Sequence, residues 1–339
     1  MTYKTIFKGR LEFGSPKSYD KVLKMYQHRV ENYYKSDVLL KEEDIFDEAS
    51  SAIYVPRFIT QGTEKSWKNT FSLLEYIAQF AVAGNFVAWM TDEGKILHHG
   101  VVEPQSDKVA VQAYLKGRDL MEESGKEDEA KAALSKAIEK YERHALAYER
   151  RGQVNLMLKN YEDAMYDFTK SIDFTFGHPE PYLGRAKVHI LNKDREAAIK
   201  DLEQSIKKSI PLQPIYWKAR RLKADCHLKL KDYEGALPDL KFFSNRQFKI
   251  EDPNYLVKRG VSFKYGKVLL ETGDFQEALN VFDSVLKMEE GNDKIAESEK
   301  ILYRGIARKK AGKTGFLKDW QQAAKLGSVQ AGKLIKENA

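Results

Sequence analysis

The sequence predicts an α+β protein, in which a small N-terminal α/β sandwich precedes an all-α superhelix of five to six helix pairs with a C-terminal capping helix. The first hundred residues combine alternating apolar patterns with two amphipathic segments, which is typical of strands and helices in a mixed layer. From about residue 109, small residues recur at a nearly regular interval, which indicates repeated structural units. We therefore expect two domains, at 1–105 and 109–339.

The N-terminal elements are expected in the order β-α-β-α-β-β, with the final two strands forming an antiparallel hairpin. Ser18 is expected to cap the first helix, and Thr63 or Ser66 the second. Pro56 cannot donate to a strand ladder, so the strand that contains it is expected at a sheet edge or at a bulge. The predicted strands cover 5–13, 52–60, 85–90 and 96–102, and the predicted helices cover 18–34 and 67–82.

The repeat pattern consists of a small residue, a second small residue 12 or 13 positions later, and a bulky residue four positions after that. A small side chain in the first helix of a pair lets the second helix approach, and the bulky side chain fills the remaining space. One helix pair cannot bury its apolar stripe alone, so the pairs must stack. The first small residues are Gly117, Gly152, Ala186, Ala224, Gly266 and Gly305, the second are Ala130, Ala164, Ala198, Ala236 and Ala278, and the bulky residues are Leu134, Phe168, Leu202, Leu240 and Phe282.

This pattern resembles the tetratricopeptide repeat over about residues 109–326, with successive spacings of 35, 34, 38, 42 and 39 residues. The last unit has Trp320 at its bulky position, and residues 329–336 are expected to form the capping helix. The resemblance does not extend to the first hundred residues, which we match to no family.

The resemblance implies that the first helix of each pair lines a concave groove, with groove positions three before and one after the small residue. The set mixes cations with apolar side chains, which suits an acidic peptide with apolar anchors. No Asn follows the small residue in any repeat, unlike the tetratricopeptide proteins that hold acidic chaperone tails. The candidate groove residues are Tyr114, Arg118, Gln153, Lys187, Arg221, Phe263 and Lys267, together with Lys218, which lies one turn earlier in the fourth repeat.

Charge and composition leave several partners open. Residues 1–108 carry 14 Lys and Arg against 15 Asp and Glu, whereas the remaining residues carry 43 against 35. This basic excess and aromatics such as Tyr148 and Trp217 keep a nucleic-acid binder as the alternative to a protein-interaction scaffold. A homo-oligomer is also left open. With no long apolar segment, no apolar leader and one cysteine, the chain is expected to be cytoplasmic, without a membrane span.

No catalytic, cofactor-binding or metal-binding constellation is found, so we expect no enzyme and no cofactor. The adjacent pair His98 and His99 is the one feature that keeps an N-terminal enzyme as a further alternative. Neighbouring strand residues point to opposite faces, so the two imidazoles are not expected to share a metal. Cys226 is expected to be a small core residue rather than a nucleophile.

Overall fold

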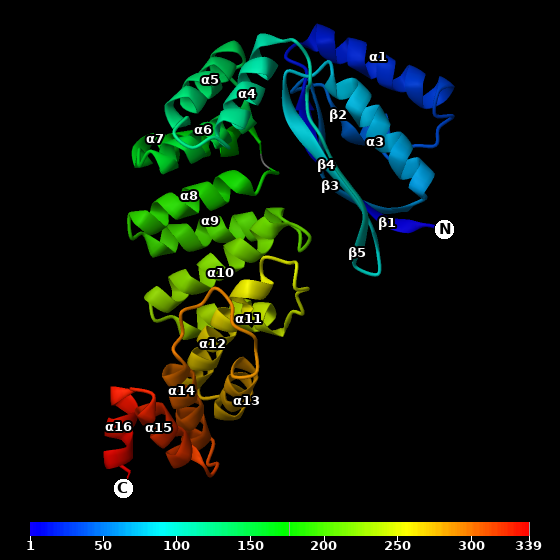
Figure 1. Ribbon diagram of the computed structural model, residues 1–339. Helices are drawn as coiled ribbons and strands as arrows, with labels where there is room; N and C mark the ends of the chain where they lie inside the picture. The colour runs from blue at the N-terminus through cyan, green and yellow to red at the C-terminus, as the bar shows by residue number, and fades with distance from the viewer. Residues whose placement is uncertain (176, 339) are drawn as a thin grey trace. The chain divides into compact units, whose positions relative to one another are not determined.

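The computed structural model describes residues 1–175 and 177–338 and contains a sheet domain followed by paired helices (Figure 1). The chain divides into two compact units, Met1–Val188 and His189–Ala339. The sheet and the first repeats thus fall within one unit. The expected α+β class is confirmed, and the domain boundary between 105 and 109 stays a prediction.

The sheet contains five antiparallel strands in the order β2-β3-β1-β4-β5. The four predicted strands correspond to β1 (Tyr3–Glu12), β3 (Ala52–Gly62), β4 (Ala83–Asp92) and β5 (Lys95–Val102). The fifth strand, β2 (Phe46–Asp47), was not predicted, because two residues are too few to show a period. The N-terminal order is therefore β-α-α-β-β-α-β-β.

Both predicted N-terminal helices are present, as α1 (Pro16–Asn32) and α3 (Glu64–Ala78), and they lie together on one face of the sheet (Figure 1). Thr63 caps α3 as expected. The expected cap of α1 is wrong: Ser15 is the N-cap, and its hydroxyl accepts from the backbone N–H of Ser18 at 3.2 Å. Pro16 at the first helical position explains this earlier start, since its fixed φ suits a helix. A four-residue helix, α2 (Glu42–Ile45), was also not predicted.

Pro56 lies at a bulge, as the sequence predicts. Phe7 of β1 pairs with Phe58, whereas Gly9 pairs with Val55, so two residues of β3 lie opposite one of β1. The missing N–H of Pro56 therefore falls where the ladder is already interrupted.

The core of the sandwich lies between the sheet and the helices. Phe7, Leu11 and Phe86 project from the sheet, and Leu73 and Ile77 meet them from α3; all five are fully buried. Burying each such side chain stabilises the fold by about 1.5–3 kcal/mol.

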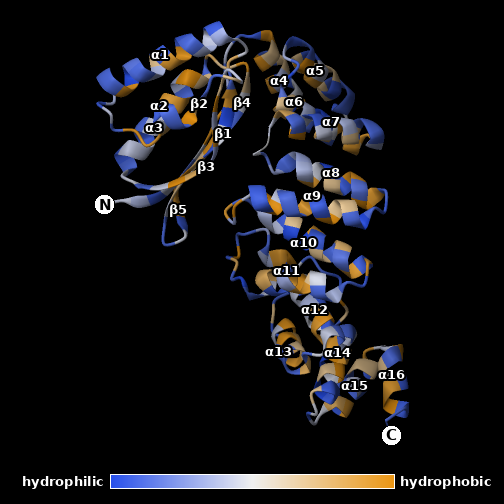
Figure 2. Ribbon diagram, turned by 180° about the vertical axis from the view of Figure 1, so that it is seen from behind, coloured by the Kyte–Doolittle hydropathy of each residue, from blue (hydrophilic) through white to orange (hydrophobic). Residues whose placement is uncertain are grey.

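The helical part begins at residue 109 and follows the predicted repeat order. Five pairs of consecutive helices pack against each other: α4 with α5, α6 with α7, α10 with α11, α12 with α13, and α14 with α15. In sequence order, α8 and α9 correspond to the third predicted pair. Figure 2 shows hydrophilic and hydrophobic residues alternating along these helices, as expected when each buries one stripe. The helices are α4 (Val109–Leu120), α5 (Glu127–Lys140), α6 (Ala145–Met157), α7 (Tyr161–Phe174), α8 (Glu180–Leu191), α9 (Arg195–Lys208), α10 (Pro214–Lys229), α11 (Tyr233–Asn245), α12 (Tyr255–Thr272), α13 (Phe275–Val285), α14 (Glu297–Lys310), α15 (Phe316–Lys325) and the capping helix α16 (Val329–Lys336).

The small and bulky residues of each pair meet as the spacing predicts. A Cβ added at Gly152 would lie 2.9 Å from the ring of Phe168, and one at Gly266 would lie 2.7 Å from the ring of Phe282. Both rings are fully buried. Glycine is therefore required at these positions by close packing rather than by an unusual backbone conformation.

Candidate functional site

All eight candidate groove residues lie on the first helix of a pair, four in each compact unit. In the first unit the candidates come from α4, α6 and α8, and in the second from α10 and α12.

In the first unit, the side chains of Tyr114 and Arg118 already have partners within the chain. Tyr114 is 4% exposed, packs on the ring of His144 at 4.9 Å between centroids, and has its pKa raised to about 12, chiefly by burial. The guanidinium of Arg118 contacts the carboxylates of Glu103 at 2.5 Å and Asp119 at 2.9 Å.

The remaining two candidates of the first unit, Gln153 and Lys187, also interact with other residues of the chain. Gln153 donates to the buried carboxylate of Glu149 and accepts from Arg150 at 3.3 Å. Lys187 is half-buried on α8 and takes part in interactions within the chain.

In the second unit, ion pairs connect the first helices of successive pairs. Lys264 of α12 contacts Asp225 of α10 at 2.5 Å, and Lys267 of α12 lies 3.7 Å from Glu299 of α14. The ammonium of Lys267 also lies 4.5 Å from the ring centre of Tyr303. The residues facing one another across α10, α12 and α14 thus form one surface, which we call the α10–α12–α14 face.

Two cations of this face differ from the rest. Lys218 is exposed, and among the described residues it has no ion-pair or hydrogen-bond partner. The buried Nε of Arg221 also lacks a hydrogen-bond partner within the part of the chain that the structure describes. Burial lowers the pKa of Arg221, and the nearby carboxylate of Asp225 partly offsets this decrease. The guanidinium of Arg221 lies 5.7 Å from the ring centre of Phe243.

The apolar candidate of this face is buried. Phe263 is 4% exposed and meets the rings of Phe282 and Tyr303 edge-on at 5.6 and 5.5 Å. Phe263 therefore packs beneath the α10–α12–α14 face and cannot contact a partner. The aromatic ring that a partner can reach on this face is that of the half-buried Tyr303. Tyr303 was not predicted, although it lies two residues before Gly305, close to the expected groove positions.

A model of the tetratricopeptide repeat family matches residues 114–174 and 183–240. These two ranges are tetratricopeptide repeats. The match begins after the sheet domain, and no curated protein matches the chain.

The structure of YrrB supports the fold of these repeats. The structure of YrrB, described as a TPR protein with an unusual peptide-binding site, has a TM-score of 0.50 and 16% identity, covering 60% of this chain and 98% of YrrB. PilF of Pseudomonas aeruginosa has a TM-score of 0.47 and 16% identity, over 68% of this chain and 98% of its own. The TPR2B domain of yeast Sti1, solved in a complex with pHsp70, has a TM-score of 0.34 and 20% identity, over 36% of this chain and 98% of its own.

Among the described residues, the helix pairs α6–α7, α10–α11 and α14–α15 have an ion pair in common that was not predicted from the sequence. A basic residue directly before the first small residue contacts an aspartate directly before the bulky residue, 15 or 16 positions later. The periodic Asp-bulky dipeptide is the signal that could have revealed it. The pairs are Arg151–Asp167 at 2.7 Å, Lys223–Asp239 at 3.1 Å and Arg304–Asp319 at 2.6 Å.

A hydrogen bond joins the sheet domain to the end of the first repeat. The hydroxyl of Tyr141, which follows α5, donates to the carboxylate of Glu12 on β1 at 3.1 Å. Within the repeats, His178, before α8, lies 3.0 Å from Glu180 of α8 and 4.0 Å from the buried Glu149 of α6. The contact with the sheet domain therefore involves the segment that follows α5.

His144 caps α6 in this region and is 1% exposed, and its Nδ1 accepts from the backbone N–H of Ala147 at 3.3 Å. Burial lowers its pKa to about 3, well below the ordinary value of about 6.5. Between these values the unfolded chain binds a proton that the folded chain excludes, so stability falls as the pH decreases below about 6.5.

We expect this histidine to reduce the free energy of unfolding by about 2 kcal/mol between pH 7 and pH 5. His144→Asn keeps a capping acceptor but does not titrate, so the variant should lose that part of the pH dependence. Urea unfolding at the two pH values measures it. An unchanged difference in the variant would contradict a neutral, buried imidazole.

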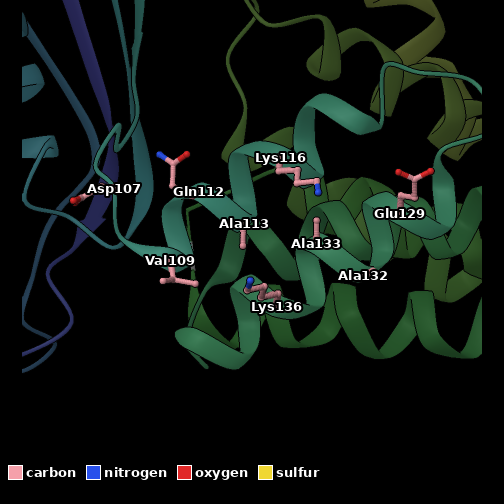
Figure 3. A pocket seen from close by; sticks show the side chains of 9 residues that line it. All are labelled: Asp107, Val109, Gln112, Ala113, Lys116, Glu129, Ala132, Ala133 and Lys136. Carbon is pink, nitrogen blue, oxygen red and sulfur yellow. The ribbon is translucent and has the colours of Figure 1, made fainter.

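A hollow of about 570 Å³ lies on the first repeat between α4 and α5 (Figure 3). Figure 3 shows Lys116 and Lys136 on either side of Ala113, with the alanines of α5 forming an apolar floor. Glu129, at one end, pairs with Lys126 at 2.6 Å. Because the lining mixes both signs of charge, the hollow favours no single class of ligand.

The histidines that suggested an enzyme lie on opposite faces of the sheet, as expected. His98 stacks on Trp67 and contacts Glu64 at 3.0 Å, whereas His99 stacks on Trp89. Cys226 is 2% exposed, and burial raises the pKa of its thiol. Within residues 1–175 and 177–338, no group of three His, Cys, Asp or Glu side chains could hold a metal ion.

Two further observations concern nucleic acid and membranes as alternative partners. The aromatics that suggested stacking with bases, Tyr148 and Trp217, are 5% and 4% exposed, so their rings are occupied by the protein core. None of the described helices is long and apolar enough to span a membrane.

Proposed function

We propose that the protein is an interaction scaffold, and that the α10–α12–α14 face binds an acidic peptide or protein segment. The observation that carries the proposal is the pair of cations on α10, Lys218 and Arg221, one exposed and the other with a buried donor lacking a partner among the described residues. YrrB, whose repeat fold this chain resembles, is described as having an unusual peptide-binding site.

The other cations of the face are less suited to bind a partner. Lys264 and Lys267 are held by Asp225 and Glu299 of the neighbouring helices, so a peptide carboxylate would have to compete with these pairs. Lys218 has no such competitor in the described chain. An incoming carboxylate would therefore meet α10 first.

Arg221 supplies the stronger interaction. Its side chain is half-buried, and a carboxylate that accepts from the terminal N–H groups of the guanidinium would form a charge-assisted hydrogen bond of about 1.5–3 kcal/mol. The neighbouring ring of Phe243 fixes the guanidinium, so little side-chain entropy is lost when the partner binds. Together the two cations favour adjacent carboxylates on one ligand.

The proposal is tested by fluorescence anisotropy with a labelled peptide of alternating glutamate and leucine. The variant Lys218→Glu/Arg221→Glu should bind about 100-fold more weakly, since two charge-assisted hydrogen bonds of about 1.5 kcal/mol each are lost. The matched control is Lys313→Glu/Lys318→Glu, which reverses two exposed charges on the last repeat.

Each outcome has a defined meaning once circular dichroism shows that the variants are folded. Loss in the α10 variant with an unchanged control supports the proposed face. Equal losses in both variants would reduce the effect to net charge. A wild-type protein that fails to bind the acidic peptide would contradict the acidic partner.

A further inference from the structure

A second cavity lies in the sheet domain and is lined by residues of α1 and α3, which run side by side (Figure 1). Its volume is about 440 Å³, within the range of roughly 300–1,000 Å³ that is usual for small-molecule sites. It is lined by Lys21, Lys24, Met25, His28, Arg29, Tyr33 and Tyr76.

The lining has one sign of charge. It contains three permanent cations and an imidazole, and none of the lining residues is acidic. Lys21, Lys24 and His28 follow one another at intervals of three and four, which places them on one face of α1. Since residues 1–108 have nearly balanced charge, this concentration of cations is local.

These cations are also unpaired, unlike two lysines of the neighbouring helix α3. Within the described ranges, neither Lys21, Lys24 nor Arg29 has a carboxylate at ion-pair distance. By contrast, Lys65 and Lys68 on α3 contact Asp37 at 3.2 Å and Glu64 at 2.7 Å. The charge of the cavity is therefore not neutralised by the chain itself.

Arg29 gives the cavity a fixed donor group. Its guanidinium lies 3.4 Å from the ring centre of Tyr76 and 5.3 Å from that of Tyr33. Stacking engages the faces of the guanidinium and leaves the in-plane N–H groups able to donate to oxygen atoms. A planar fork beside two flexible ammonium groups matches the several oxygens of a phosphate group.

We infer that this cavity binds the phosphate group of an anionic ligand. Lys21 and Lys24 neutralise the charge, and Arg29 orients the phosphate through paired N–H···O bonds. The inference concerns a different surface from the α10–α12–α14 face and does not depend on peptide binding there.

Calorimetric titration of the full chain with sodium pyrophosphate at low ionic strength tests the inference. We expect saturable binding at one site per chain. The variant Lys21→Gln/Lys24→Gln should weaken it at least about tenfold, because two charge-assisted contacts are lost. Lys65→Gln/Lys68→Gln removes the same charge from the same domain at paired positions, and should change the affinity by less than about twofold.

Arg29→Lys separates geometry from charge, since it keeps the cation but removes the planar fork; we expect about a fivefold loss. A second probe, phosphatidylcholine vesicles containing phosphatidylinositol 4-phosphate, distinguishes a lipid headgroup from a soluble phosphate. Co-sedimentation that requires Lys21 and Lys24 assigns the cavity to a headgroup, and pyrophosphate binding without co-sedimentation assigns it to a soluble ligand. Failure of both probes, or equal losses in the two lysine variants, would overturn the inference.

Discussion

Replacing Phe282 by alanine is expected to lower the local free energy of unfolding of the fifth repeat by about 3–5 kcal/mol. The ring of Phe282 is fully buried and packs against Phe263 at 5.6 Å and Tyr303 at 6.0 Å between centroids. Its removal therefore leaves a cavity between α12 and α13, next to the helix of the following repeat. Hydrogen exchange of the amides of α12 and α13 measures the loss directly.

Hydrogen exchange is preferred because repeats contact only their neighbours and need not unfold in one step. The matched control is Phe242→Ala on α11, where the side chain is 46% exposed and a loss of only about 1 kcal/mol is expected. Unchanged protection of α12 and α13 in the Phe282 variant would show that the ring does not hold the two helices together.

Gly266 provides a second arm of the same experiment. An added Cβ would lie 2.7 Å from the ring of Phe282, so Gly266→Ala alone is expected to destabilise the repeat despite the better helix propensity of alanine. In the Phe282→Ala background the clash is gone, and the same substitution should become stabilising. A change of sign between the two backgrounds is expected only if the two side chains compete for one space.

These close contacts could be predicted from the sequence, because helix spacing fixes which residues meet. The same reasoning located α16 and the hairpin of β4 and β5, where apolar periodicity or turn residues are clear. The helix α2 and the strand β2 were not predicted, because they are too short to show a periodic apolar pattern. The predicted cap of α1 was Ser18, whereas the observed cap is Ser15.

The sequence could not predict which groove candidates are free to bind a partner, because this depends on whether residues of other segments already contact them. Arg118 meets Glu103, which lies 15 positions earlier in the connection to the sheet domain. Gln153 meets Glu149, whose burial depends on the fold of the whole first unit. In contrast, nothing in the pattern of α10 distinguishes Lys218 and Arg221 from these residues, and only their surroundings do.

The ion pair of the second repeat should be as important as the aromatic core. The carboxylate of Asp167 is 1% exposed and accepts from Arg151 at 2.7 and 3.0 Å and from Asn155 at 2.9 Å. Asp167→Ala leaves the largely buried guanidinium of Arg151 without its counter-charge, and we expect a loss of about 3–5 kcal/mol in the stability of α6 and α7. Hydrogen exchange of these two helices measures it.

Asp163→Ala is the matched control, because Asp163 lies on the same helix and its carboxylate is 62% exposed in a surface pair with Lys131; we expect less than about 1 kcal/mol there. The double variant Arg151→Met/Asp167→Leu tests the cause. If the cost of Asp167→Ala comes from the uncompensated charge, the double variant should be more stable than the single one, because both charges are removed together. If it is equally unstable, the hydrogen bond to Asn155 and the shape of the aspartate hold the helices, and the periodic aspartates serve the repeats through geometry rather than charge.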